Sequence, residues 1–319
     1  MRDVAWRRFA SLLILSALPA ATGCAGIKRF AINKLGDTLA EGGSVYETDD
    51  DLELVGSALP FGLKLIESLL AQSPGHRGLL LAASQGFTSY AYGYVDLEAD
   101  EVAETDLDRG KRMWARARRL YIRAHRYGMR GLEISCPGIG ERMAADPDGA
   151  AAAAERNDVP LLYWSAASLG LAISAARDDA AMLARLPEVA ALLDRAKALD
   201  EDWQEGALHE FEITFAGARS GFSLADVPRL KRHFDRAKEL SGGRRASLFV
   251  TYAEAVSVRT QDAVEFRALL GEALGIDPDA HERLRLTNLI SQRRARWLMS
   301  RIEELFLDPE GTGPTEGDS

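Results

Sequence analysis

The segment LDRAKAL at residues 193–199 returns as FDRAKEL at residues 234–240, which lies 41 residues further along the chain. Ala196 and Ala237 hold the same place in the two copies, and Ala273 follows after another 36 residues in a similar context. A small residue at this place in each repeat lets neighbouring helices approach closely, as in tetratricopeptide units, which repeat about every 34 residues. The recurrence therefore predicts an all-α fold, a degenerate tetratricopeptide-like solenoid of helical hairpins.

Helical periodicity continues on both sides of this repeat. Leu52, Val55, Leu59 and Leu63, for example, recur at intervals of three or four residues, the spacing of one helical face. Alternation with a period of two, which is typical of strands, does not occur between turn residues. The glycines and the proline within residues 128–140 predict a long connection there. The helices that we expect span residues 49–72, 76–100, 107–128, 141–155, 159–177, 187–199, 203–219, 226–240, 243–259, 262–274 and 279–306.

The composition argues against several classes of partner. The 319 residues include 48 acidic and 39 basic side chains, and the resulting net charge of −9 offers no basic surface to nucleic acid. The two cysteines, Cys24 and Cys136, and the dispersed histidines do not have the spacing of a zinc site. We therefore expect no nucleic-acid partner, no metal and no cofactor, and a free thiol at Cys136.

Catalytic motifs are incomplete wherever the sequence approaches one. Ser84 lies in a near match to the nucleophile elbow, but Ala82 replaces the first glycine and the segment falls inside an expected helix. The segment HEFE at residues 209–212 lacks the second histidine of a zinc-protease helix. We therefore predict that the protein is not an enzyme and has no catalytic residues.

The N-terminus is typical of an export signal. A basic start at residues 1–8 precedes an apolar stretch at residues 9–21, which is too short to remain as a membrane-spanning helix. Small residues at positions 21–23 then lead into Cys24, which resembles the lipobox of bacterial lipoproteins. We expect a lipoprotein signal peptide over residues 1–23 and lipid attachment at Cys24. Ordinary cleavage after small residues is the alternative.

The expected lipid also predicts where the protein resides. Acyl chains on a cysteine hold a soluble body on a membrane. Ala25 follows the cysteine, rather than the aspartate that retains many lipoproteins at the inner membrane, which favours the periplasmic face of the outer membrane. Behind the anchor we expect a tether over residues 24–48, a helical-repeat domain over residues 49–307 and a disordered tail over residues 308–319.

Aromatic side chains gather at helical spacing and suggest a ligand cavity. Tyrosine suits a pocket between helices because its ring is apolar while its hydroxyl group can form hydrogen bonds. Ordinary packing between helices is the alternative for each of these residues. The candidate cavity residues are Phe87, Tyr90, Tyr94, Tyr163, Trp164, Phe211 and Phe215.

Several short sequence segments, in their order along the chain, resemble those of a known family. These are LPFGLKLIESLL at 59–70, HRGLLL at 76–81, GFTSYAY at 86–92, YGMRGLE at 127–133, LYWSAA at 162–167 and RLTNLISQRRARWL at 285–298. Together with the lipobox they resemble the TatT family, the tetratricopeptide lipoproteins that form the T component associated with TRAP transporters. The resemblance spans roughly residues 50–306. It implies a periplasmic helical-repeat body with a hydrophobic pore or cavity, a trimeric assembly, and association with the transporter's substrate-binding protein.

These observations lead to one expected function and two alternatives. We expect a lipid-anchored accessory protein that docks a TRAP substrate-binding protein and holds or relays a small, partly apolar ligand. A solenoid surface commonly binds other proteins, so an envelope scaffold that holds peptides or protein partners in its groove is the first alternative. An unrecognised hydrolase is the second.

Overall fold

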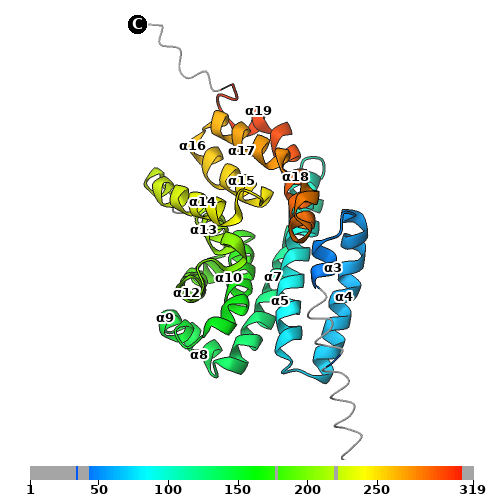
Figure 1. Ribbon diagram of the computed structural model, residues 1–319, viewed down its shortest axis with the longest axis vertical. Coiled ribbons are helices and arrows are strands. Elements are labelled where there is room, and N and C mark those ends of the chain that lie inside the picture. Colours follow the sequence, from blue (N-terminus) through cyan, green and yellow to red (C-terminus); the bar gives the residue numbers. More distant parts are fainter. Residues whose placement is uncertain (1–33, 35–42, 177–178, 219–221, 311–319) are drawn as a thin grey trace, which may run out of the picture.

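The computed structural model describes residue 34 and residues 43–176, 179–218 and 222–310. Every element in these ranges is helical, so the predicted all-α class is confirmed (Figure 1). The predicted signal peptide, Cys24, most of the tether and most of the C-terminal tail lie outside the described residues.

The helices follow one another with short connections. The longer ones are α4 (Leu52–Gln72), α5 (Arg77–Ala91), α7 (Leu107–Ser135), α10 (Val159–Ser174), α12 (Leu186–Leu199), α13 (Ala207–Ala218), α14 (Val227–Ser241), α17 (Ala263–Gly275) and α18 (Arg285–Ser300). The shorter ones are α3 (Gly43–Glu47), α6 (Leu97–Ala103), α8 (Ile139–Met143), α9 (Pro147–Ala151), α11 (Ala180–Leu183), α15 (Ala246–Tyr252), α16 (Val258–Thr260) and α19 (Ile302–Leu305). Two π-helical turns, η1 (Tyr92–Asp96) and η5 (Ala253–Ser257), interrupt otherwise continuous helices, and short 3₁₀ turns include η3 (Trp203–Gly206).

Local sequence signals fix where many of these helices begin. The Asp51 carboxylate accepts hydrogen bonds from the backbone N–H groups of Glu53 and Leu54 at 3.0 and 2.9 Å. Asp106 and Asp262 cap α7 and α17 in the same way. Prolines occupy the first turn of α10, α12 and α14, where no intrahelical N–H is needed. These caps satisfy backbone donors that would otherwise remain unpaired.

The long connection expected over residues 128–140 is wrong, because α7 continues to Ser135. Its glycines serve helix packing rather than a turn. A Cβ atom at Gly128 would overlap the Ser165 hydroxyl, and one at Gly131 would lie 2.6 Å from the Leu161 side chain. The two glycines therefore let α10 approach α7 closely, and this contact outweighs their low helix propensity.

Two other expected helices are divided. The segment 141–155 contains only the short helices α8 and α9, because Asp146 caps a new helix whose first residue is Pro147. The segment 279–306 starts with two 3₁₀ turns, and its long helix α18 begins only at Arg285. In the first segment Pro147 prevents one continuous helix, because its ring cannot continue the helix that precedes it.

Three apolar clusters hold the helices together. One joins η1, α7, α10 and α12, a second joins α13 through α19, and a third joins α4, α5 and α7. Helix α13 belongs to two of them, because Phe211 and Phe215 face the first cluster while Ile213 and Ala216 face the second. Helix α13 therefore links the N-terminal and C-terminal halves of the fold.

The chain closes on itself at α18. In Figure 1 the C-terminal helices curve back toward the N-terminal hairpin, and α18 contacts both α3 and α4. The guanidinium of Arg293 lies 2.8 Å from Glu101 of α6, and the indole N–H of Trp297 donates to Glu104 at 2.6 Å. We call this junction of α18 with α6, η1 and the start of α4 the seam. It joins segments almost two hundred residues apart largely through charged and polar side chains.

Helix α4 is, among the described helices, the one that is long and apolar enough to cross a membrane. It packs on α5 through Leu63, Leu69 and Leu70, as a core helix does. Its opposite face nevertheless exposes Leu54 and Phe61, which are 58% and 75% accessible. Helix α4 therefore combines a buried apolar face with an exposed one.

Candidate functional site

A cleft of about 450 Å³ opens between α12, α13 and α14. Small-molecule sites commonly have volumes of roughly 300–1,000 Å³. Its apolar lining is Ala190, Leu193, Phe215 and Ala216, and its polar lining is Asp194, Lys197, Glu212, Arg229 and His233. The cleft thus offers a ligand both apolar surface and charged groups.

Ion pairs organise the polar part of this cleft. The Lys197 ammonium contacts the Glu212 carboxylate closely and lies 3.0 Å from Asp194. Arg229 is held more loosely, because its nearest carboxylate oxygens, on Glu212 and Asp226, both lie 3.8 Å away. Such a separation is too long for a hydrogen bond. The Lys197–Glu212 pair is therefore the fixed part of the lining, whereas the guanidinium of Arg229 keeps its donors available.

Two histidines contact each other at the edge of the cleft, which His233 lines. The Nδ1 atoms of His209 and His233 lie 2.9 Å apart, and His209 Nε2 lies 3.1 Å from a Glu201 oxygen. Burial lowers the pKa of His209 and lowers that of His233 to about 4, because a charged imidazole loses its hydration there. Both rings are consequently neutral at pH 7, and one Nδ1 must donate to the other.

Four of the seven sequence-predicted cavity residues form one aromatic cluster beside the cleft. Tyr163 packs on Trp164 and Phe211 with ring centroids 5.0 and 6.1 Å apart, and Phe211 stacks on Phe215 at 6.2 Å. Trp203 completes the cluster, 4.6 Å from Tyr163. Phe215 is the member that also lines the cleft. Sequence reasoning did not select Trp203, which it placed at the first residue of an expected helix and which the structure places in the short turn η3.

The other three predicted residues lie elsewhere, on α5 and η1. Phe87 is buried and stacks on Tyr127 of α7 with centroids 5.9 Å apart. Tyr90 and Tyr94 stack on each other at 6.0 Å, and the Tyr94 ring fills the space beside Gly56 of α4. The structure therefore separates the seven residues into two groups on different helices.

Both π-helical turns contribute side chains to a polar cluster around Arg294. Arg294 of α18 is buried, and its Nη2 lies 2.6 Å from Glu254 of η5 and 2.8 Å from Asp100 of α6. The pKa of the Tyr92 phenol on η1 is raised, because loss of hydration, followed by the charge of Glu254, disfavours the phenolate. A π turn inserts an extra residue into a helix and often occurs at functional positions. Here the two turns place Tyr92 and Glu254 near the same guanidinium.

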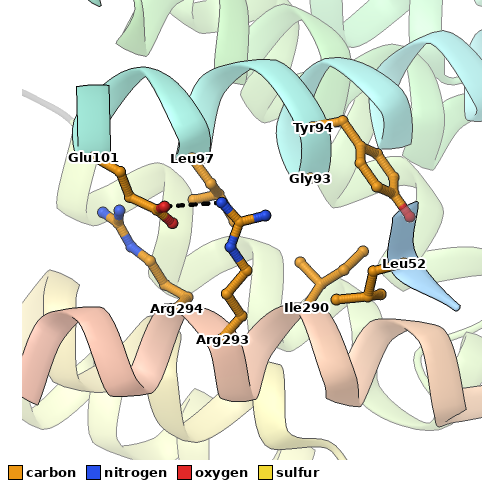
Figure 2. Close-up of a pocket in the computed structure, with 8 residues that line it drawn as sticks. All are labelled: Leu52, Gly93, Tyr94, Leu97, Glu101, Ile290, Arg293 and Arg294. Carbon is orange, nitrogen blue, oxygen red and sulfur yellow. Dashed lines mark hydrogen bonds and ion pairs between the residues drawn. The ribbon is translucent and has the colours of Figure 1, made fainter. Parts of the chain in front are cut away.

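A small pocket lies in the seam next to this cluster (Figure 2). In the figure Tyr94 and Leu97 approach from η1 and α6, while Ile290 and Arg293 approach from α18. The space measures only about 10 Å³, which is about the volume needed for one water molecule. The seam is therefore closed to a ligand in this conformation.

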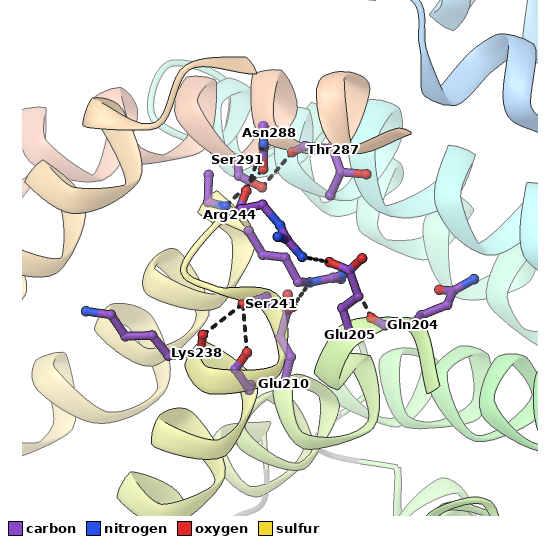
Figure 3. A network of polar contacts seen from close by, with 12 residues as sticks. Gln204, Glu205, Glu210, Lys238, Ser241, Arg244, Thr287, Asn288 and Ser291 are labelled. Carbon is purple, nitrogen blue, oxygen red and sulfur yellow. Dashed lines mark hydrogen bonds and ion pairs between the residues drawn. The ribbon is translucent and has the colours of Figure 1, made fainter. Parts of the chain in front are cut away.

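A polar network ties the α14–α15 turn to the rest of the fold (Figure 3). Arg244 pairs with Glu205 at 2.8 Å, and Arg245 pairs with Glu210 at 2.9 Å. Asn288 of α18 accepts from the Ala246 N–H at 2.9 Å and donates to the Arg244 carbonyl at 3.0 Å. The network links α13, α15 and α18 through residues that a periodicity search does not single out.

The same network supports an unusual backbone conformation in η3. Gln204 and Glu205 have φ values of 46° and 54°, in the left-handed region that side chains with a Cβ rarely adopt. Gly206 follows with a φ of 94° and packs directly against Ala237, so a Cβ there would lie 2.8 Å from the Ala237 Cα. The two arginine pairs therefore stabilise a strained turn that sets the direction of α13.

The other residues considered for chemistry do not form a reactive site. Ser84 lies inside α5, is buried, and its Oγ has no hydrogen-bond partner among the described residues. No cluster of three metal-ligating side chains occurs in the part of the chain that the structure describes. Cys136 is buried and free.

Comparisons with known proteins place this geometry in a family. The family model described as TRAP transporter T-component matches residues 48–306. An uncharacterized protein of Treponema pallidum (strain Nichols) is 30% identical over 305 residues, covering 89% of this chain and 94% of that protein. The family match includes the whole of the cleft, the aromatic cluster and the seam. The chain therefore belongs to the TRAP transporter T-component family, as the resemblance of its sequence predicted.

Proposed function

We propose that this protein is a lipid-anchored accessory component of a TRAP-type transport system, which docks the substrate-binding protein and holds or relays a small, partly apolar ligand. The family match over residues 48–306 carries the assignment to the transport system. It is a family of transporter components and not of enzymes, and the incomplete catalytic motifs agree with a binding role.

We propose further that the helical hairpins form a degenerate tetratricopeptide-like solenoid that presents the docking surface. The buried small residues Ala196 and Ala237 support this, because each lies at the same place in its own repeat and is fully buried. Solenoid surfaces are large enough to hold a folded partner. The substrate-binding protein is the partner that the family suggests.

The anchor and the assembly belong to the same proposal. Lipid on Cys24 would hold the body at the periplasmic face of the outer membrane and raise the local concentration of its partner. For the homotrimer, the exposed apolar face of α4 supplies a surface on which copies can meet. Phe61 is 75% accessible there, which is unusual for a phenylalanine unless another surface covers it.

For the ligand, we propose that the cleft between α12, α13 and α14 is the holding site, together with the aromatic cluster behind it. Phe215 supports this, because it lines the cleft and stacks on Phe211 in the cluster. Phe87, Tyr90 and Tyr94 lie too far along the fold to share this cleft.

Co-purification tests the docking part of the proposal. The tagged mature protein, with its lipid intact, should capture the cognate TRAP substrate-binding protein from native envelope in detergent. Replacement of Cys24 with serine should release the protein from membranes while leaving capture intact. Failure of the intact protein to capture the substrate-binding protein would contradict the docking role. Acyl-dependent membrane fractionation that persists in Cys24→Ser would contradict the anchor.

The assembly is tested separately by Phe61→Glu. The substitution should shift the protein from trimer to monomer in analytical ultracentrifugation, because a charge on the exposed face of α4 would oppose its burial. Gln72→Glu, on the same helix at an exposed position, is the matched control. A protein that remains trimeric after Phe61→Glu would remove α4 as the contact surface.

A further inference from the structure

Some charged side chains in the cleft between α12, α13 and α14 are already paired, and others can still form hydrogen bonds to a ligand. Lys197 and Glu212 are paired with each other and are largely shielded, with 21% and 12% of their side chains accessible. Asp194 is 67% accessible, and its one described ion pair is to this already paired lysine. One carboxylate oxygen of Asp194 therefore remains able to accept hydrogen bonds.

Arg229 provides hydrogen-bond donors that carry a positive charge and are not used by the protein. Its side chain is 39% accessible, and its two ion pairs are both 3.8 Å long. No hydrogen bond from its guanidinium occurs to the described residues, although an arginine carries five N–H donors in a planar fork. That fork matches the two oxygens of a carboxylate. The cleft thus presents one free acceptor group, on Asp194, and one free donor group, on Arg229.

The total charge of the lining limits which ligand can use both groups. Asp194 and Glu212 balance Lys197 and Arg229, and His233 is neutral at pH 7 because burial lowers its pKa to about 4. A ligand with a single charged group would pair with Arg229 or with Asp194, but not with both. A neutral ligand that carries separated positive and negative groups leaves the balance unchanged.

The apolar lining defines the rest of the ligand. Leu193 and Phe215 are buried against the neighbouring helices and present their accessible edges to the cleft, together with Ala190 and Ala216. These side chains offer no hydrogen-bonding group to a ligand. They fit an aliphatic or aromatic group attached to the dipolar head.

We propose that this cleft binds a zwitterionic α-amino acid with an apolar side chain, with its carboxylate on Arg229, its ammonium on Asp194 and its side chain against Leu193 and Phe215. The inference rests on the proposed function in one respect, namely that the cleft holds a small ligand. It adds the chemical class of that ligand, which the family assignment does not supply.

Isothermal titration calorimetry of the full mature protein tests the class of ligand with three matched probes. L-Leucine carries both head groups, 3-methylbutylamine lacks the carboxylate, and 4-methylpentanoate lacks the amine. L-Leucine should bind about 10-fold or more tightly than either analogue, because each lost charge-assisted hydrogen bond leaves its partner unpaired. Equal binding of 4-methylpentanoate would overturn the zwitterion assignment, and no binding of L-leucine or L-phenylalanine would overturn the proposal altogether.

Substitutions then locate the site. Arg229→Gln and Asp194→Asn should each weaken L-leucine binding about 10-fold or more, whereas Arg229→Lys should retain part of the affinity because it keeps the charge. Arg232→Gln is the control, since Arg232 is exposed on the same helix and does not line the cleft. Unfolding midpoints measured beside the titrations separate loss of binding from loss of fold. Unchanged binding in Arg229→Gln and Asp194→Asn, with the fold intact, would place the ligand elsewhere.

The outcomes also distinguish this inference from the proposed function. Capture of the substrate-binding protein without amino-acid binding would refute the ligand class and leave the docking role standing. Amino-acid binding without capture would support the ligand class and refute the docking role.

Discussion

Replacing Gly128 with alanine probes the point at which α5, α7 and α10 cross. Gly128 is buried in α7, and a methyl group there would overlap the Ser165 Oγ on α10 and lie 2.9 Å from the Ser84 Oγ on α5. Both hydroxyl oxygens are buried and have no hydrogen-bond partner among the described residues. The crossing therefore has no spare volume for the added methyl group.

Two opposing contributions set the size of the effect. Alanine is favoured over glycine inside a helix by about 0.8–1.0 kcal/mol. Forcing an extra methyl group into a filled contact costs about 1–3 kcal/mol. Gly128→Ala should therefore lower the free energy of unfolding by about 1 kcal/mol. When Ser165 is also alanine, the overlap with the Ser165 hydroxyl is removed, and the new methyl group meets the Cβ of residue 165 at 3.3 Å and the Ser84 Oγ at 2.9 Å, so a large part of the cost disappears.

The assay is a double-mutant cycle in Gly128→Ala and Ser165→Ala, with unfolding by denaturant followed by circular dichroism. The coupling between the two positions should be about 1–2 kcal/mol, since they share one contact. Gly271→Ala is the control, because Gly271 is exposed on α17 and a Cβ there meets no atom within 4 Å. That control should be stabilising. If Gly128→Ala stabilises the protein as much as Gly271→Ala does, the close approach of the three helices is refuted.

Three further predictions concern other parts of the core. Ala237→Leu should lower the free energy of unfolding by about 1–3 kcal/mol, because Ala237 packs against the Gly206 backbone. Arg232→Leu, at an exposed site of the same helix, should change the free energy of unfolding little. Equal effects of the two substitutions would contradict the packing at Ala237. Cys136 is buried, and burial raises the pKa of its thiol. A thiol reagent should therefore label Cys136 only after the protein unfolds. Rapid labelling of the native protein would contradict the burial of this thiol. His125 accepts from Arg185 through Nε2, and burial followed by the charge of Arg185 lowers its pKa from 6.5 to about 4. Its contribution to stability is therefore present above pH 6.5 and is lost as the pH falls toward 4, and His125→Asn should flatten the pH dependence of the unfolding free energy in that window.

The fold class and most helix positions could be predicted from the sequence, because apolar periodicity and capping residues act locally. Asp51, Asp106 and Asp262 mark helix starts within a few residues of those expected. The prediction that the third helix ends at Gly128 was wrong, because the role of this glycine depends on its contact with α10, which lies about 40 residues further along the chain. A glycine that permits a helix crossing and a glycine that ends a helix look the same in one sequence.

The candidate site was less accessible to sequence reasoning. The aromatic residues Tyr163, Trp164, Phe211 and Phe215 could be selected as aromatic side chains on two expected helices, and the structure brings these four together. The charged lining of the cleft could not be selected, because Asp194, Arg229 and His233 look like ordinary surface residues of separate helices. The shift of register that separates Tyr94 from Phe87 comes from the π turn at Tyr92–Asp96, which periodicity analysis does not anticipate.

The seam changes how the proposed helical repeats should unfold. In a linear repeat array each unit touches only its neighbours, so the end units fray first and stability grows as units are added. Here Arg293 and Trp297 bind the last long helix to α6 through Glu101 and Glu104, and the array has no free end in the part of the chain that the structure describes. Unfolding of any one hairpin therefore breaks its contacts with two neighbouring hairpins, whereas unfolding of an end unit in a linear array breaks contacts with one. Such a protein should melt as a single cooperative unit, with amide hydrogens in α4 and α18 exchanging as slowly as those in α10.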